Sequence, residues 1–138
     1  MINFRLDENS VNDLVMMTGI DKELARLLCS GENPVSSCTQ VYGCYENNEL
    51  VAIMTATYSI VFPHEDGTRM VHISGAYTKF EYRNLGFATM LLRAIERDAI
   101  DCFHADYLCC DSTANELYIK SGFVKAPSDE TRLWKQLR

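Results

Sequence analysis

The segment YRNLGFATMLLRAIE, from Tyr82 to Glu96, combines an arginine, a glycine and a small residue just before a helical pattern. Gly86 lets the backbone approach a ligand closely because it has no Cβ, and Ala88 is nearly as small. The first N–H groups of a helix lack internal partners and favour an anion. Arg83 can add a charge-assisted contact. The segment therefore predicts a cradle for a phosphate or pyrophosphate group.

Taken alone, this pattern is weak. Arg or Gln followed by x-x-Gly-x-Gly/Ala arises by chance in roughly one chain in ten of this length, given average residue usage. The segment lacks the GK[ST] ending of a Walker loop, and the chain has no GxGxxG fingerprint. The position of the segment between a predicted strand and an amphipathic helix is what favours an anion site.

The elements that position the cradle follow from the spacing of apolar and turn residues. Two helices are expected first, with Asp21 as the N-cap of the second and Gly19 ending the first. An antiparallel meander of three strands should follow, with turns at Asn47-Asn48-Glu49 and at Asp66-Gly67. The expected ranges are 7–19 and 21–31 for the helices and 40–46, 50–62 and 69–78 for the strands, with a polar loop over 30–39.

Helical periodicity returns between Gly86 and Ile100, where apolar residues occupy one face. The remaining expected elements are a buried strand over 105–111, a helix over 113–122 that ends at Gly122, and strands over 123–126 and 132–137. A strand–helix–strand crossover requires a parallel pair. The sequence predicts an α/β fold, a mixed and mostly antiparallel twisted sheet flanked by helices, in a single domain over residues 1–138.

Composition narrows the class of protein. The chain has 138 residues and a net charge of −6, and its 13 Lys and Arg are scattered, which argues against nucleic acid as the main partner. No apolar run is long enough to cross a membrane, and the first ten residues do not form a signal peptide. The six cysteines contain no CxxC pair, so we expect reduced, mostly structural thiols and no metal. A cytoplasmic protein is the expectation.

Two segments together resemble a known family. AYTKFEYRNLGFATMLLRAIERDA resembles the acetyl-CoA-binding segment of the GNAT N-acetyltransferase superfamily, in which a strand and a short loop lead to G-x-G or G-x-A at a helix start. DSTANELYIKSGF resembles the second signature of the family, the helix N-x-x-A-x-x-L-Y-x-x-x-G-F. They occur in the expected order and cover roughly residues 71 to 126. The resemblance implies a GNAT-like acyl-CoA N-acyltransferase fold and acetyl-CoA as the co-substrate.

The resemblance also implies a role for individual residues. The backbone N–H groups from Leu85 to Thr89 and the Arg83 side chain would hold the pyrophosphate, and the strand end near Tyr77 would pair with the pantetheine arm. Tyr118 matches the tyrosine that protonates the departing thiolate as general acid. The full expected cofactor set is Tyr77, Thr78, Arg83, Leu85, Gly86, Phe87, Ala88, Thr89, Asn115 and Tyr118. The reaction would be direct transfer, in which an amine attacks the thioester carbonyl.

The general base is less evident, because members of the family use a carboxylate, a histidine or an ordered water. His72 lies on the strand that leads to the cradle, and histidine can take up a proton near neutral pH. It is the side-chain candidate, with water as the alternative. The sequence also departs from the family at Asp111, where asparagine is frequent; this carboxylate could alter hydrogen bonding or cap a helix.

The acceptor would be a primary amine on a small metabolite, polyamine, antibiotic or protein. Its pocket should be built from the first two helices, the loop 30–39 and the hairpin 62–68. The residues of these segments do not indicate a particular amine. A non-catalytic acyl-CoA-binding or interaction module is the alternative function, and binding of a phosphate ligand without acyl chemistry is a third. We expect no nucleic-acid or membrane partner. A homodimer formed through a terminal strand stays open.

Overall fold

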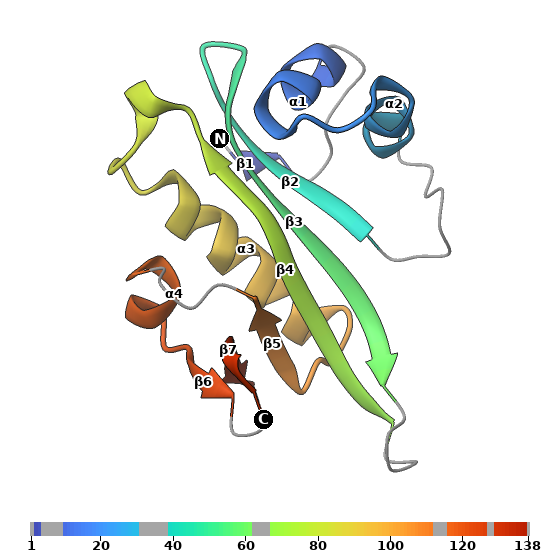
Figure 1. Ribbon diagram of the computed structural model, residues 1–138, viewed down its shortest axis with the longest axis vertical. Helices are drawn as coiled ribbons and strands as arrows, with labels where there is room; N and C mark the ends of the chain where they lie inside the picture. Colours follow the sequence, from blue (N-terminus) through green and yellow to red (C-terminus); the bar gives the residue numbers. More distant parts are fainter. Residues whose placement is uncertain are drawn as a thin grey trace.

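A seven-stranded mixed sheet forms the centre of the protein in this computed structural model, which describes residues 2–3, 10–30, 39–61, 67–111, 116–126 and 129–137 (Figure 1). The strands lie in the order β1-β2-β3-β4-β5-β7-β6. Their bounds are β1 Ile2–Asn3, β2 Thr39–Glu46, β3 Glu49–Val61, β4 Thr68–Thr78, β5 Tyr107–Cys110, β6 Val124–Ala126 and β7 Asp129–Gln136. The β4–β5 pair is parallel and the other five pairs are antiparallel, which confirms the predicted fold class.

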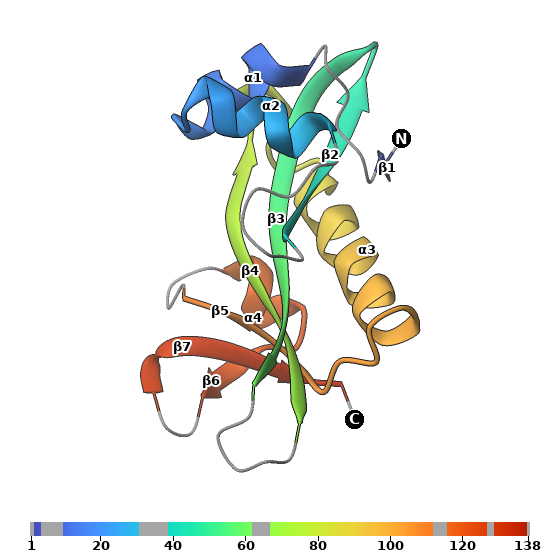
Figure 2. The same cartoon turned by 90° about the vertical axis from the view of Figure 1, so that its right-hand side faces the viewer.

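Helices cover both faces of this sheet. Their bounds are α1 Val11–Thr18, α2 Lys22–Ser30, α3 Phe87–Asp101 and α4 Glu116–Lys120, and a 3-10 turn spans Phe80–Tyr82. Figures 1 and 2 show α1 and α2 on one side of strands β2 to β4 and α3 on the other. Among the described helices, none has the length and apolar character needed to cross a membrane.

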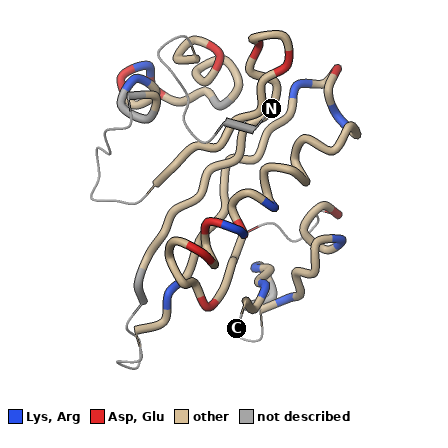
Figure 3. The backbone as a smooth tube through the Cα atoms, turned by 180° about the vertical axis from the view of Figure 1, so that it is seen from behind, with Lys and Arg blue, Asp and Glu red and all other residues tan. Residues whose placement is uncertain are grey.

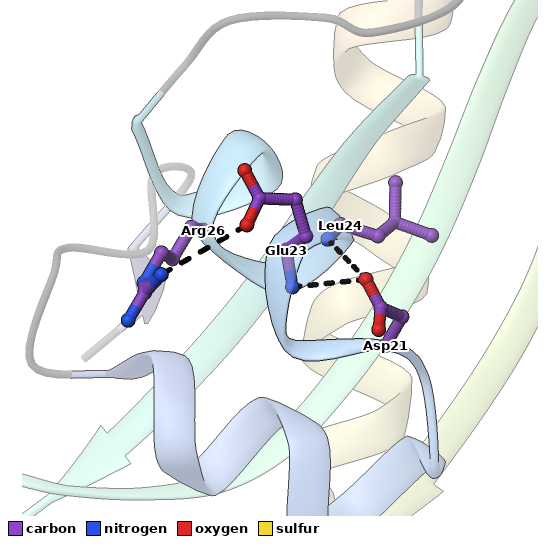
Figure 4. Close-up of polar contacts among 4 residues, drawn as sticks. All are labelled: Asp21, Glu23, Leu24 and Arg26. Atoms are coloured by element: carbon purple, nitrogen blue, oxygen red, sulfur yellow. Dashed lines mark hydrogen bonds and ion pairs between the residues drawn. The ribbon is translucent and has the colours of Figure 1, made fainter.

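The helix ends match their sequence signals. The Asp21 carboxylate accepts hydrogen bonds from the N–H groups of Glu23 and Leu24, at 3.0 and 3.4 Å, and so caps α2 as predicted (Figure 4). Gly19 ends α1 with a φ of 72°, and its N–H donates to the Val15 carbonyl. Gly122, with a φ of 98°, follows α4. These ends are formed by contacts within four residues, which is why the sequence predicts them.

The meander confirms the predicted strands and extends them. Asn47 and Asn48 have φ values of 50° and 64°, as the two central residues of a type I′ turn require. β1, which pairs with β2 through only two residues, was not predicted from the sequence. Gly67 has a φ of 66°, whereas its predicted turn partner Asp66 lies outside the described residues. The same holds for 31–38 of the expected polar loop.

Two apolar clusters flank the sheet. The larger one joins α3 and α4 to β2–β5 and β7, and includes Leu91, Leu92, Ile95 and Leu108. The smaller one lies under α1 and α2 and includes Leu14. Of the cysteines, Cys29, Cys44, Cys109 and Cys110 are buried, as expected for thiols that act as small apolar residues. The two clusters fix which sheet face each helix covers.

Candidate functional site

The site begins where β4 separates from β5. The two strands pair from Met70 opposite Tyr107 to Ile73 opposite Cys110, and the pairing ends there. Beyond this point β4 continues to Thr78 with no strand beside it on the β5 side, within the described part of the chain. Residues 74–77 are consequently exposed, although β4 is a central strand. An exposed strand edge in the middle of a sheet can hydrogen-bond an extended ligand.

A β-bulge sits at the same place. β3 pairs Ile53 with Tyr77 but Thr55 with Ser74, so β4 holds one extra residue between these pairs. Gly75 occupies the bulge with a φ of 61°, and a Cβ on it would come within 3.2 Å of the Thr55 hydroxyl oxygen. Bulges redirect a strand and are common beside binding sites. Here the bulge falls where β4 leaves its partner.

The cradle predicted from the sequence lies at the start of α3. Gly86 is the N-cap of this helix with a φ of 89°, a conformation that favours glycine. The first intrahelical hydrogen bond runs from the Met90 N–H to the Gly86 carbonyl, at 3.0 Å. Within the described residues, the N–H groups from Leu85 to Thr89 have no acceptor. These donors and the positive end of the helix dipole together suit a phosphate.

Two hollows flank this helix start. The smaller has a volume of about 330 Å³ and the larger about 770 Å³, and both are lined by Asn84, Ala88 and Leu117. The smaller is also lined by Ala76, Tyr77, Thr78, Tyr82, Arg83 and Phe87. The larger is also lined by Gly86, Thr89, Leu92, Arg93, Glu96, Glu116, Lys120, Ser121 and Lys135. They form one groove from the exposed edge of β4, past the start of α3, toward α4.

Arg83 lies at the strand end of this groove. Its Nε donates to the Thr78 carbonyl at 2.9 Å, and its guanidinium lies 5.8 and 5.7 Å from the ring centres of Tyr77 and Phe80. These contacts orient the side chain along the 3-10 turn. The remaining guanidinium N–H groups point to no acceptor among the described residues.

An ion pair fastens the turn that leads to the cradle. The Lys79 ammonium lies 2.8 Å from Glu49 Oε1, and the Tyr82 hydroxyl donates to Glu49 Oε2 at 3.3 Å. The pKa of the Glu49 carboxyl is lowered, mainly by its hydrogen bond with Lys79. The Lys79 N–H also bonds to the Val51 carbonyl. The turn is thereby held against the start of β3.

Tyr118 lies on α4, with its ring in the larger apolar cluster and only 3% of the residue exposed. Its ring meets that of Phe123 edge-on, with the centres 5.3 Å apart. Burial raises the pKa of Tyr118 to about 12, with a smaller contribution from Cys110. Among the described residues no buried side-chain oxygen lacks a partner, yet none hydrogen-bonds to this hydroxyl. The hydroxyl oxygen therefore keeps some contact with solvent.

His72 lies on the other face of the sheet. Its neighbours Val71 and Ile73 belong to the cluster under α3, so the alternation of β4 turns His72 away from α3. His72 Nε2 is 3.1 Å from Asp111 Oδ2, and Arg132 Nε is 3.1 Å from Asp111 Oδ1. The carboxylate that departs from the family pattern is therefore bound to two side chains.

The structure brings most of the predicted residues together. Tyr77, Thr78, Arg83, Phe87 and Ala88 line one hollow, and Gly86, Ala88 and Thr89 line the other. The remaining predicted residues lie as follows: Leu85 is exposed beside the cradle, Tyr118 and His72 line neither hollow, and Asn115 is outside the described residues.

Sequence reasoning missed several residues of the groove. Arg93, Lys120 and Lys135 contribute positive charge to the larger hollow, and Lys135 pairs with Glu96 at 2.9 Å. They come from α3, α4 and β7, so no sequence motif could have joined them.

Charge elsewhere is dispersed. Figure 3 shows Lys and Arg spread over the described helices, strands and turns, interleaved with Asp and Glu. The residues that the structure describes contain no group of three or more His, Cys, Asp or Glu side chains that could hold a metal ion. The expectation of a metal-free site stays a prediction.

Comparisons with known proteins agree on the fold. The chain resembles Arabidopsis thaliana NAA60, crystallised with a bisubstrate analogue, at 12% identity and a TM-score of 0.76 over 99% of this chain and 98% of that one. A GNAT-family acetyltransferase from Staphylococcus aureus Mu50 gives 16% identity and a TM-score of 0.73 over the whole of both chains. A predicted acetyltransferase from Clostridium acetobutylicum, crystallised with acetyl-CoA, gives 22% and 0.67 over 94% of each. No curated protein is significantly similar in a sequence search.

The family is identified by a match between this sequence and a protein-family model. The model described as the acetyltransferase (GNAT) family matches residues 19–123, which span α2 through α4 and include the bulge, the cradle and Tyr118. The solved structures share the same fold over nearly the whole chain. The protein therefore belongs to the GNAT acetyltransferase family.

Proposed function

We propose that this protein transfers the acetyl group of acetyl-CoA directly to a primary amine. The observation that carries the proposal is the continuity of the groove: the exposed edge of β4 runs into a helix start whose N–H groups have no internal acceptor. Acetyl-CoA needs a strand edge followed by an anion site, because an amide-containing arm joins its thioester to a pyrophosphate. The Clostridium acetobutylicum neighbour, crystallised with acetyl-CoA, supports the same ligand.

The donors of the cradle fit the cofactor. The N–H groups from Leu85 to Thr89 would bind the pyrophosphate, and Arg83 would add its remaining guanidinium donors. Main-chain groups of Tyr77 and Thr78 would pair with the pantetheine amides, as an added strand pairs with a sheet edge. Asn115, proposed from the family resemblance alone, would contact the cofactor from the α4 side.

Tyr118 would stabilise the leaving group. Bound acetyl-CoA supplies an activated acyl group, and its sulfur departs as a thiolate. A phenol with a pKa of about 12 stays protonated at neutral pH and can donate a hydrogen bond. A thiolate of ordinary pKa, near 8.5, is a weaker base than a phenolate of this pKa, so complete transfer of the proton from Tyr118 would be uphill. We therefore favour hydrogen-bond donation by Tyr118, with the final proton drawn from solvent, over the full general-acid step.

His72 is the side chain proposed as general base, with an ordered water as the alternative. It lies on the sheet face opposite α3, one residue before the last β4–β5 pair. Tyr118 belongs to the cluster on the α3 face. An amine that approaches from the sheet face carrying α1 and α2 would thus meet His72 on that face. The departing sulfur would lie toward the α3 face, where Tyr118 is.

The acceptor would be a small-molecule or peptide amine. The Arabidopsis thaliana neighbour was crystallised with a bisubstrate analogue, which supports an acceptor that meets the donor in one complex. A cytoplasmic location and the absence of nucleic-acid and membrane partners stay predictions from the sequence. The sequence made no choice between a monomer and a homodimer.

The first test is thermal unfolding with acetyl-CoA, free coenzyme A or ATP as the added ligand. A ligand that binds only the folded state stabilises it by about 2.7 kcal/mol at a hundredfold excess over its dissociation constant. We expect a saturable rise in Tm with acetyl-CoA and none with ATP. An equal response to ATP would indicate general phosphate binding and would contradict the proposal.

The second test is turnover of an amine panel, followed by thiol release. Tyr118→Phe should lower kcat by tenfold or more while acetyl-CoA affinity is kept, because the lost hydroxyl acts on the departing sulfur. Tyr58→Phe is the matched control, since burial also raises the pKa of Tyr58 to about 12 but its hydroxyl bonds to Tyr42. Binding of acetyl-CoA with no acetylated amine would favour a non-catalytic acyl-CoA-binding module.

A further inference from the structure

Three polar side chains meet on the sheet face opposite α3. His72 comes from β4, Asp111 directly follows β5, and Arg132 comes from β7. The register brings them together, because His72 lies opposite Cys109 and Cys110 lies opposite Leu133. α1 and α2 lie near the other end of the long strands, away from β5 and β7 (Figures 1 and 2). No described helix therefore covers this cluster.

The Asp111 carboxylate uses its two oxygens for different partners. Oδ2 is 3.1 Å from His72 Nε2, and Oδ1 is 3.1 Å from Arg132 Nε. A guanidinium stays charged at all physiological pH values and favours an ionised carboxylate beside it. An ionised carboxylate can only accept hydrogen bonds, so the ring nitrogen that faces it must carry the proton.

The other ring nitrogen of His72 is then available. In a neutral imidazole with the proton on Nε2, Nδ1 holds a free lone pair. Nδ1 has no hydrogen-bond partner among the described residues, and 30% of the side chain is exposed. The thiol of Cys109, opposite His72 in the ladder, is protonated at neutral pH because burial raises its pKa to about 11. It brings no competing charge.

We infer that Asp111, held by Arg132, is a positioning residue that fixes His72 in the tautomer with Nδ1 free to accept the proton of the attacking amine. The inference rests on the proposed acetyl transfer and adds how its base is oriented. As the amine nitrogen bonds to the acyl carbon, one N–H proton moves to His72 Nδ1. The carbon–sulfur bond breaks with its electron pair on sulfur, which is then protonated from solvent, and His72 Nδ1 returns its proton to solvent.

The orientation can be measured without any reaction. Imidazole ¹⁵N chemical shifts in the free protein report which ring nitrogen carries the proton. At a pH where the ring is neutral, we expect the Nε2–H tautomer of His72 to dominate in the wild type. In Asp111→Asn the amide can accept or donate, so both tautomers should appear. A wild type with the proton on Nδ1, or an unchanged tautomer ratio in Asp111→Asn, would overturn the inference.

Kinetics then separates positioning from simple stabilisation. Asp111→Asn should lower kcat/KM roughly tenfold, the scale of a lost hydrogen bond to a charged group, with acetyl-CoA affinity unchanged. In a His72→Ala background the same change should have no further effect, since Asp111 acts through His72. Additive losses, or full activity of His72→Ala, would overturn the inference while leaving acetyl transfer intact. If no amine is acetylated by the wild type, acetyl transfer and the positioning role fail together, whatever the tautomer.

Discussion

Replacement of Gly86 by alanine tests the phosphate cradle most directly, because a matched control exists elsewhere in the chain. Gly86 and Gly19 both adopt positive φ, 89° and 72°, and a Cβ on either would meet no protein atom within 4 Å. The expected loss of stability is therefore backbone strain alone, about 1–2 kcal/mol for an alanine in this region. The gain from a less flexible unfolded chain applies to both variants and cancels in the comparison.

Binding should distinguish the two glycines. The Cβ of Gly86→Ala enters open space at the start of α3, where N–H donors without an internal acceptor would hold the pyrophosphate. A methyl group there keeps a phosphate oxygen from these donors and weakens charge-assisted hydrogen bonds of about 1.5–3 kcal/mol each. We expect the dissociation constant of acetyl-CoA to rise at least tenfold, about 1.4 kcal/mol. Gly19→Ala, at the end of α1, should leave it unchanged.

The assay pairs isothermal titration calorimetry of acetyl-CoA with urea denaturation of each variant. Similar unfolding free energies and a binding defect confined to Gly86→Ala would support the cradle. If Gly86→Ala binds within twofold of the wild type, the pyrophosphate is not held at this helix start. An equal loss in both variants would mean that general destabilisation, and not the cradle, controls binding.

Three further predictions concern the buried tyrosines and the larger hollow. Burial raises the pKa of Tyr58 and Tyr118 to about 12 from 10.0; their contribution to stability is complete below pH 10 and is lost as pH rises to about 12, by up to about 2.7 kcal/mol each. Urea denaturation across this range should show the decline, and the Phe variants should flatten it. Tyr42→Phe removes the hydroxyl that donates to Asp98 at 2.7 Å and should lower the free energy of unfolding in urea by about 1–3 kcal/mol. A loss smaller than about 0.5 kcal/mol would count against a stabilising role for this hydrogen bond. Arg93→Ala should weaken acetyl-CoA binding about two- to fivefold in calorimetry at low salt with unfolding unchanged, and a salt-independent defect would contradict a charge contact in the larger hollow.

The sequence by itself determined the features that depend on neighbours along the chain. The Asp21 cap, the turn at Asn47 and Asn48, and the glycine that opens α3 each arise within a few residues, so their spacing predicts them. The order of strands and helices also followed, since the apolar period changes from two to 3.6 at identifiable residues. The geometry of the helix start at Gly86 was predictable for this reason: donors, glycine and helix are consecutive.

Only the tertiary structure decided what the cradle faces. The separation of β4 from β5 depends on pairing between residues 37 positions apart in the chain and on a bulge that no local pattern predicts. The cluster of His72, Asp111 and Arg132 joins β4, the residue after β5, and β7, and its side chains meet only because the register aligns them. The depth of Tyr118 likewise depends on packing against other elements. Long-range register and packing place side chains from distant segments at a common point, and no sequence spacing encodes that distance.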